Sequence, residues 1–428
     1  MGTLQRVVIT GHGAICASGR CPASIFDSLI DGNVTISEIR SWDVKNWACR
    51  LGGVIESRPS ELINDRKLLK LIKKTDVFGI YAAEQALTSA SINEYRGALG
   101  EKAEDYFSER FGVFVGTSGR YHDIQYDFLQ LIAEGKDSTP SIGERLEGGV
   151  NPMWLLRNLP NNVLCHVGIK HKLKGVNSCI INHSTSGLLS IIEAFESLHI
   201  GETDRAIAIG HDAPVEPQNI LYYQNAGLLA ETKLTPFDSE RSGCILGEGG
   251  AALVLETMEA AISRSALLHA EVLGKGCTSE AQGLLPIRED GDGIERAICL
   301  ALEQGKLKAT QIGMIVCHGN GTKISDLSEG AAIRRVFGTQ IPPITCFKWA
   351  FGHTVSAAGS IDTILAITAL QRGVIPAIAP LRTIDPALQD LPLVRVSRPP
   401  LSDTALILSR GFGGQNCALV IRAKPVRC

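Results

Sequence analysis

The sequence has no excess of positive charge and no long apolar run, and this argues against nucleic acid and membranes as partners. Its 428 residues carry a formal net charge of −3, so no basic surface for phosphate backbones is expected. No run approaches the roughly 18 consecutive apolar residues of a membrane span. The first residues, MGTLQRVVITG, read as a strand entering a glycine turn rather than as a secretory leader. We therefore expect a cytoplasmic protein.

Cysteine is present but lacks the spacing that binds metals or forms redox disulfides. The twelve cysteines are scattered, and no two form a CxxC pair. Several, such as Cys179 and Cys317, stand in apolar runs where a reduced cysteine packs as a small hydrophobe. REDGDG (288–293) lacks the glutamate that completes a calcium loop, and we expect a turn there with Asp292 or a neighbour capping the next helix. The sequence thus predicts free thiols and no metal site.

The glycine-rich signature of a dinucleotide site is incomplete. ITGHGAICASG (9–19) contains Gly11 and Gly13, but Cys16 stands at the third glycine position. No convincing acidic residue follows at the distance at which one would bind a ribose. We therefore predict no dissociable cofactor.

Apolar runs typical of buried strands alternate with helical segments along the whole chain. The strand runs are continuous rather than alternating, as expected of strands buried on both faces. This alternation predicts a layered α/β architecture. The candidate strands are 6–11, 111–117, 178–182, 206–210, 251–256, 270–276, 314–319, 344–347, 405–409 and 417–422, and the candidate helices include 185–198, 293–304, 327–336 and 357–371.

A weak internal repeat suggests two related halves. Ser184-Thr-Ser-Gly187 before LLSIIEAF is echoed by Ser356-Ala-Ala-Gly359 before SIDTILAI. Small residues at both helix starts would let the two helices pack closely at the centre of the molecule. We place the boundary near 256, giving halves 1–256 and 257–428.

The irregular stretch 118–165 is typical of a lid or an interface excursion.

Residues able to do chemistry collect where candidate strands end. Ser184 follows the run 178–182 and precedes a helix, and His318 follows another strand in CHGNGT (317–322). Lys348 and His353 flank a sharp loop in CFKWAFGHTVSAAG (346–359), and Phe412 stands in the glycine turn SRGFGGQN (409–416). Strand-end loops are where α/β folds collect catalytic groups, so we expect these side chains to meet.

These motifs together resemble those of β-ketoacyl-ACP synthases I and II, within the thiolase-like superfamily. The resemblance spans nearly the whole chain, with the motifs in the family's order. KGVN (174–177) is similar to the family's KGPN, PFDSERSGCILGEGGAALVLE (236–256) to PFDxxRDGFxxGEGAGxLVLE, HGNGT (318–322) to HGTGT, Lys348 through His353 to KxxxGH, and GFGGQN (411–416) to GFGGTN.

The resemblance implies a thiolase-like five-layered α-β-α-β-α fold built of two related halves. It implies that the two histidines and Lys348 are catalytic, that Phe412 guards the malonyl pocket, and that Asn320, Thr322 and Gly413 contact substrate. It further implies a homodimer whose substrate arrives on the phosphopantetheine arm of an acyl carrier protein. Asn320 departs from the family's threonine, and Arg410 beside the glycine turn is a further departure.

The most consequential departure is serine at the position of the family's catalytic cysteine. In NHSTSG that position is Ser184, and Cys179 lies too far upstream to replace it. A cysteine thiol has a pKa of about 8.5, which a helix N-terminus can lower into the neutral range. A helix dipole contributes only about 0.3–1 kcal/mol and cannot ionise a serine hydroxyl. A condensing reaction through a stored acyl group is therefore not expected.

Decarboxylation does not need that sulfur, because N–H groups from His318 and His353 can stabilise an enolate. Serine at this position resembles the Ser-for-Cys ketosynthase-like decarboxylases of polyketide β-branching cassettes, and this resemblance implies a decarboxylase that converts malonyl-ACP to acetyl-ACP in polyketide biosynthesis. Two alternatives remain open: a chain-length-factor-like partner of an active ketosynthase, and an acyltransferase that uses Ser184 as nucleophile. A core or interface role for His183 is favoured over a catalytic one.

Overall fold

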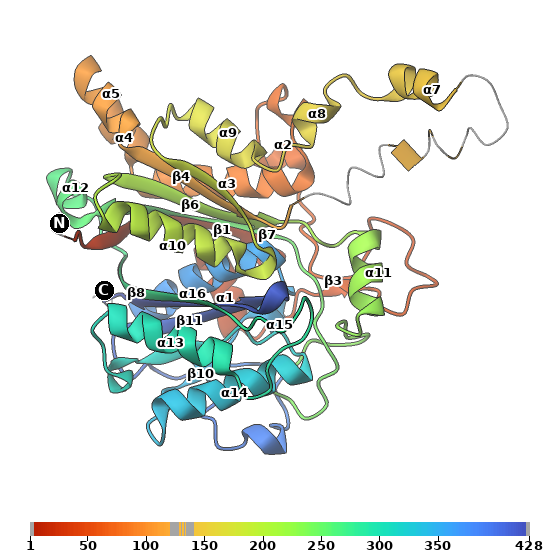
Figure 1. Cartoon of the computed structure of the whole chain (residues 1–428), viewed down its shortest axis with the longest axis vertical. Helices are drawn as coiled ribbons and strands as arrows, with labels where there is room; N and C mark the ends of the chain where they lie inside the picture. Colours follow the sequence, from red (N-terminus) through yellow and green to blue (C-terminus); the bar gives the residue numbers. More distant parts are fainter. Residues whose placement is uncertain (1–3, 120–127, 130, 132, 134–140, 425–428) are drawn as a thin grey trace.

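The computed structural model describes residues 4–119, 128–129, 131, 133 and 141–424. Within these residues the predicted layered α/β architecture is confirmed (Figure 1). All ten candidate strands are present, and they form one ten-stranded mixed sheet in the order β10-β9-β11-β12-β8-β1-β7-β6-β4-β5. Their bounds are β1 Val7–Cys16, β4 Phe111–Thr117, β5 Asn177–Ile181, β6 Arg205–Asp212, β7 Gly249–Thr257, β8 Ala270–Ser279, β9 Met314–Val316, β10 Ile344–Thr345, β11 Thr404–Gly411 and β12 Gln415–Arg422.

The sheet consists of two five-stranded parts with the same topology. In each part the first strand pairs antiparallel with the fifth, the fifth antiparallel with the fourth, and the fourth, second and third run parallel. The two first strands, β1 and β8, join the parts through only three residue pairs, from Val7–Val272 to Ile9–Ala270. The two related sets of strands agree with the internal repeat, while the division into units 1–256 and 257–428 stays a prediction.

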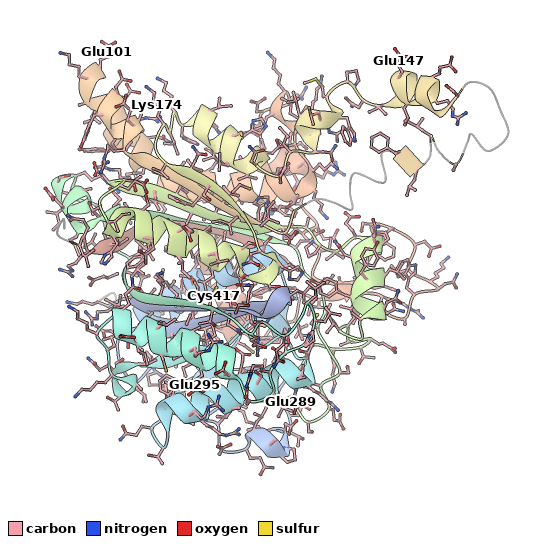
Figure 2. The ribbon with its side chains drawn as sticks, viewed as in Figure 1. Glu101, Glu147, Lys174, Glu289, Glu295 and Cys417 are labelled. Carbon is pink, nitrogen blue, oxygen red and sulfur yellow. The ribbon has the colours of Figure 1, made fainter. Side chains whose placement is uncertain are left out.

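Helices form three layers around the two sheet parts (Figure 1). The central layer separates the sheet parts, and each outer layer covers one of them. The central layer holds α10 (Ser186–His199), α16 (Ala358–Arg372) and α1 (Pro22–Ile30), one outer layer holds α3 (Lys74–Ser89) and α9 (Asn162–Lys170), and the other holds α13 (Asp292–Gln304) and α14 (Lys323–Phe337). Charged side chains such as Glu101 and Glu147 project outward, whereas Cys417 lies buried between layers (Figure 2).

Shorter elements decorate this core. Much of the segment 118–165 lies outside the described residues, and its described part projects from the body as α7 and α8. The remaining elements are α2 (Pro59–Leu62), α4 (Ile92–Gly97), α5 (Glu101–Glu109), α7 (Ile142–Gly149), α8 (Trp154–Arg157), α11 (Pro217–Asn225), α12 (Met258–Ser263), α15 (Lys348–Phe351) and a two-stranded sheet of β2 (Ser37–Glu38) and β3 (Leu51–Gly52).

One expectation about the glycine-rich segments was wrong. Strand β1 continues through its glycines to Cys16 instead of turning at Gly11, since Gly11 and Gly13 let α3 approach the strand. A Cβ on either glycine would lie only 2.4 Å from an α3 atom. At 288–293 the expected turn leads into α13, and a neighbour of Asp292 caps the helix: Gly291 takes the cap position with a φ of 70°, and Asp292 is the first helical residue.

The two small-residue helix starts meet as predicted, at the crossing of α10 and α16. A Cβ on Gly187 would lie 2.3 Å from the carbonyl oxygen of Ser356, and one on Gly359 would lie 2.6 Å from the Cβ of Leu188. Each glycine therefore permits a backbone approach that no other residue type allows. This crossing holds the two halves together directly behind Ser184.

Gly187→Ala is expected to lower the free energy of unfolding by about 1–3 kcal/mol, because the added methyl overpacks the crossing. Gly168→Ala on α9 is the matched control, since its Cβ would lie 3.7 Å from the nearest atom. The control should be neutral or stabilising, as alanine favours helix more than glycine does. Urea unfolding midpoints of the two variants measure the difference, and equal midpoints would contradict the close crossing.

Candidate active site

Ser184 stands in a single helical turn between strand β5 and helix α10. The turn spans His183–Thr185, and α10 begins at Ser186, so the strand-to-helix position expected for the serine is observed. The backbone N–H of Asn182 donates to Ser186 Oγ at 2.7 Å and closes this turn. Ser184 is buried, with 2% of its surface exposed.

The two predicted histidines are both buried beside this serine. His318 follows β9, where the backbone N–H groups of His318 and Gly319 donate to the Glu329 carboxylate at 2.8 and 3.0 Å. His353 follows α15, after a Gly352 whose φ of 83° lets the chain turn sharply. The rings of His318 and His353 meet edge to face, with their centroids 5.1 Å apart.

Ser184 forms hydrogen bonds with two histidines. Its Oγ lies 3.0 Å from His353 Nε2 and 2.9 Å from His183 Nδ1. His183 Nε2 in turn lies 2.6 Å from the hydroxyl of Tyr223, which comes from helix α11. The His183 ring also stacks on Phe412, with centroids 4.3 Å apart. The side chain of His183 therefore belongs to the candidate site, and the core or interface role favoured from the sequence stays a prediction.

Burial keeps the imidazoles neutral. It lowers the pKa of His318 and of His353 well below the usual value, and the positive charge of Lys348 lowers both further. Burial also lowers the pKa of His183 to about 4. Lys348 itself does not line the cavity beside the serine, and its Nζ forms a fully buried ion pair with Asp362 at 2.7 Å.

The hydrogen bonds assign the proton positions of the two cavity histidines. The backbone N–H of Arg410 points at His318 Nδ1 over 3.5 Å, which leaves the ring proton on Nε2. In the described part of the chain, His353 Nδ1 is buried without a partner. An unpaired buried N–H is rarer than an unpaired acceptor, so we place the His353 proton on Nε2 as well. Both rings then present an N–H donor.

These groups surround a cavity of about 80 Å³. It brings together Ser184, His318, His353, Asn320, Thr322 and Phe412 of the predicted residues. Asn320 is engaged within its own turn, because its Oδ1 accepts from the Thr322 hydroxyl at 2.8 Å. Gly413 does not line the cavity; it lies in the turn behind Phe412, where its N–H donates to the Leu284 carbonyl.

Sequence reasoning did not find several of the cavity's residues. Arg410 had been noted only as a departure from the family pattern, yet its buried guanidinium pairs with Glu280 at 2.7 Å beside the cavity. Cys244 also lines the cavity, but burial raises its pKa to about 12, so it is a thiol and does not replace the missing nucleophile. Tyr223 comes from α11, and no motif in the sequence pointed to it.

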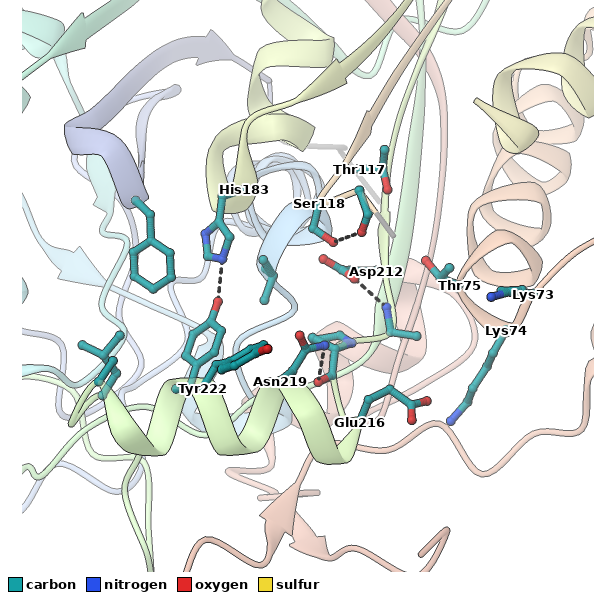
Figure 3. Close-up of a pocket in the computed structure, with 18 of the residues that line it drawn as sticks. Lys73, Lys74, Thr75, Thr117, Ser118, His183, Asp212, Glu216, Asn219 and Tyr222 are labelled. Carbon is teal, nitrogen blue, oxygen red and sulfur yellow. Dashed lines mark hydrogen bonds between the residues drawn. The ribbon is translucent and has the colours of Figure 1, made fainter. Parts of the chain in front are cut away.

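A larger pocket of about 380 Å³ adjoins the cavity (Figure 3). His183, Tyr223 and Phe412 line both spaces and form the partition between them. Asp212, whose pKa burial raises to about 6, lies on its inner wall, and the exposed Tyr222 lies on its rim. The catalytic cavity and the larger pocket therefore share one aromatic wall.

Within the described residues there is no group of three or more histidine, cysteine, aspartate or glutamate side chains placed to hold a metal ion. Among the same residues, no helix has the length and apolar character needed to cross a membrane.

Comparison with known proteins identifies the family. Residues 4–261 match the family model "Beta-ketoacyl synthase, N-terminal domain", and residues 269–382 match "Beta-ketoacyl synthase, C-terminal domain". The chain is 29% identical to 3-oxoacyl-[acyl-carrier-protein] synthase 2 of Synechocystis sp., over 98% of each chain. It is 27% identical to the enzyme of that name from Staphylococcus aureus strain N315, over 99% of each chain.

Solved structures agree with this match. The ishigamide ketosynthase/chain length factor is 27% identical and superimposes with a TM-score of 0.87, covering 98% of this chain and 100% of that one. A β-ketoacyl synthase from Burkholderia phymatum STM815 gives the same identity and TM-score, over 99% of this chain and 100% of its own. With its two thiolase-like sheet parts and matches over most of its length, the chain belongs to the β-ketoacyl synthase family.

Proposed function

We propose that this protein is a decarboxylase that converts malonyl-ACP to acetyl-ACP. One observation carries the proposal: two buried, neutral imidazoles share a small cavity with a serine hydroxyl where the family's condensing cysteine would stand. The arrangement keeps the groups that stabilise an enolate and lacks the thiolate that stores an acyl chain. We propose a polyketide pathway as its setting, because a serine at the cysteine position resembles the ketosynthase-like decarboxylases of such pathways.

The reaction follows from the two N–H donors. The bond between the malonyl Cα and its carboxylate breaks, CO₂ leaves, and the electron pair moves onto the thioester oxygen as an enolate. Nε2–H groups of His318 and His353 would donate to that oxygen as its charge develops. One such preorganised donor is typically worth about 2.7–4 kcal/mol of transition-state stabilisation. Protonation of Cα then gives the acetyl thioester.

The size of the cavity supports a short acyl group. Pockets for drug-sized ligands commonly have volumes of about 300–1,000 Å³. The space beside Ser184 measures about 80 Å³, which is far smaller. The named relatives act on substrates attached to an acyl carrier protein, and we propose the same carrier, with its phosphopantetheine arm, for this chain.

The direct test is to incubate the purified protein with malonyl-ACP and follow the acyl group by mass spectrometry. We expect a mass loss of one CO₂ and no acyl adduct on the protein. Acetyl-ACP incubated under the same conditions serves as the substrate control and should stay unchanged. Malonyl-ACP that stays intact with a competent carrier would overturn the proposal.

Serine acylation is the second candidate, because Ser184 Oγ lies only 3.0 Å from His353 Nε2. For His353 to act as the base, its Nε2 would have to accept the hydroxyl proton, which requires the tautomer opposite to the one assigned above. An ester on Ser184 after incubation with acyl-ACP would favour this candidate. A chain-length-factor-like role is weaker, because such a partner has no need of the two histidines and Lys348.

We propose a homodimer that forms through strand β5. This strand lies at one end of the sheet and pairs with β4 on one side, and Ile181 on it is 43% exposed. An uncovered edge strand with apolar side chains is a pairing surface. Light scattering of the wild type should give twice the mass of one chain, and the Ile181→Lys variant should give the mass of a single chain. A wild-type monomer that binds a separate ketosynthase would instead support the partner-subunit alternative.

A further inference from the structure

The proposed decarboxylation leaves a carbanion that needs a proton, and the hydroxyl of Ser184 in the cavity is placed to donate it. Ser184 Oγ can accept two hydrogen bonds and donate one. It lies between His353 Nε2 and His183 Nδ1, at 3.0 and 2.9 Å. While both rings donate to it, the serine's own proton points into the cavity. When substrate binds, His353 Nε2–H shifts from Ser184 to the thioester oxygen, and the Nδ1–H of His183 alone keeps the serine proton directed at the cavity.

The proton on His183 is assigned by Tyr223. Among the described residues, the only hydrogen-bond partner of the Tyr223 hydroxyl is His183 Nε2, at 2.6 Å. The buried phenol is therefore satisfied when it donates its proton to Nε2. The neutral ring then carries its own proton on Nδ1, from which it donates to Ser184. The result is one directed chain, from Tyr223 through His183 to Ser184.

This chain crosses the partition between the two spaces. Ser184 lines only the small cavity, whereas His183 and Tyr223 line both. The larger pocket reaches the surface at Tyr222, which is 48% exposed. Figure 3 shows the larger pocket with His183 on its wall, hydrogen-bonded to the tyrosine on α11. Solvent can thus reach the Tyr223 end of this hydrogen-bonded series, and substrate can reach the Ser184 end.

The His183 backbone adds independent support. Its φ of 50° is left-handed, a conformation that residues other than glycine seldom adopt. Such strain persists only where the surroundings impose it, and it concentrates at functional sites. Phe412 stacks on the ring and Tyr223 holds its Nε2, so both neighbours fix the ring's orientation.

We propose that Tyr223, His183 and Ser184 form a proton relay that delivers a solvent proton to the substrate carbanion, an inference that rests on the proposed decarboxylation. The Ser184 O–H bond breaks as the Cα–H bond forms. Serine takes the Nδ1 proton of His183, His183 takes the hydroxyl proton of Tyr223 at Nε2, and water in the larger pocket reprotonates Tyr223. The hydroxide left combines with CO₂, so malonyl thioester and water give acetyl thioester and bicarbonate.

The relay explains why two side chains that can donate protons, His183 and Ser184, occupy the family's cysteine position and the residue before it. In a condensing enzyme, a proton donor beside the carbanion would quench the nucleophile before it attacked the acyl chain. In a decarboxylase the same donor completes the reaction. His183 ends each cycle with its proton on Nε2, and exchange with solvent restores the Nδ1 tautomer while the cavity is open between turnovers.

The test compares wild type with Tyr223→Phe and His183→Phe, which remove the transferable protons and keep the stacked rings. Tyr222→Phe is the matched control: it removes a hydroxyl from the same helix, and that hydroxyl accepts from Gln218 rather than from His183. Acetyl-ACP formation should fall at least about tenfold in both relay variants and stay unchanged in the control, since general acid catalysis contributes about 10²–10⁴-fold.

A second readout separates proton delivery from CO₂ loss. With ¹³C-bicarbonate and carbonic anhydrase present, a carbanion that waits for a proton can recapture CO₂. We expect ¹³C to enter the remaining malonyl-ACP with the relay variants and not with wild type or Tyr222→Phe. Wild-type kinetics without label exchange in either relay variant would overturn the relay and leave the decarboxylase standing. A wild type that does not consume malonyl-ACP would overturn the proposed function and, with it, the relay.

Discussion

Replacing His318 by alanine is expected to slow CO₂ release from malonyl-ACP by about 10²–10³-fold, the usual cost of one oxyanion donor. The His318 ring is buried, and its pKa lies well below the usual value, so the ring is neutral. The backbone N–H of Arg410 donates to Nδ1, and the ring proton on Nε2 is therefore available to the substrate. His353→Ala should have an effect of the same order, because the two rings lie side by side.

Two variants control this experiment. His318→Gln keeps an N–H donor near the position of Nε2 and should recover part of the rate. Ser184→Ala should slow CO₂ release less than either histidine variant, because its hydroxyl acts after the C–C bond has broken. Stopped-flow detection of CO₂ ranks the variants. If Ser184→Ala proved the most damaging and the histidine variants mild, serine acylation would replace enolate stabilisation as the mechanism.

Lys348→Met is expected to lower the free energy of unfolding by about 3–5 kcal/mol, the cost of leaving one partner of a buried ion pair alone. Lys348 Nζ and Asp362 Oδ2 lie 2.7 Å apart, and each side chain is 1% exposed. Burial already raises the pKa of Asp362, and Lys348 opposes that rise. Without the lysine, the carboxylate must ionise unpaired or take up a proton.

The pH dependence of that loss identifies its cause. With the folded pKa of Asp362 raised above the unfolded value, the folded state holds more protons, so stability falls as pH rises. Lys348→Met should therefore be closer to wild type near pH 5 than near pH 8. Adding Asp362→Asn removes the charge and should recover much of the stability at the higher pH. A double variant no more stable than Lys348→Met would mean that lost packing, rather than the unpaired carboxylate, causes the effect.

The strands could be predicted because each buried strand is a continuous apolar run. Their ends were less predictable. Glycine marks a turn in many sequences, but Gly11 and Gly13 continue β1, and it is α3 packed over them that requires their small size. Conversely, β9 ends at Val316, because Gly319 and Gly321 adopt positive φ values and lead the chain into the loop after His318.

The candidate site was predictable where its residues stand in motifs and not where a distant helix supplies them. Ser184, His318 and Phe412 each stand in the turn that follows a strand, and His353 stands in the loop that follows α15, so their chain positions carried the signal. Tyr223 lies on α11, outside the motifs, and Cys244 lies within the motif 236–256 without any sign that it faces the site; both reach the same cavity only through the packing of the fold. His183 had no assigned role, with a core or interface position favoured, because the sequence does not show which way its side chain points.

By itself, the sequence determined the family, the order of the strands along the chain and the replacement of a thiol by a hydroxyl, since these depend on residue identity and local pattern. Tertiary structure alone decided which atoms meet: the 5.1 Å between the two imidazole rings, and the chain from Tyr223 to Ser184. Proton positions on the histidines follow from those contacts, because a neutral imidazole places its one proton according to its neighbours.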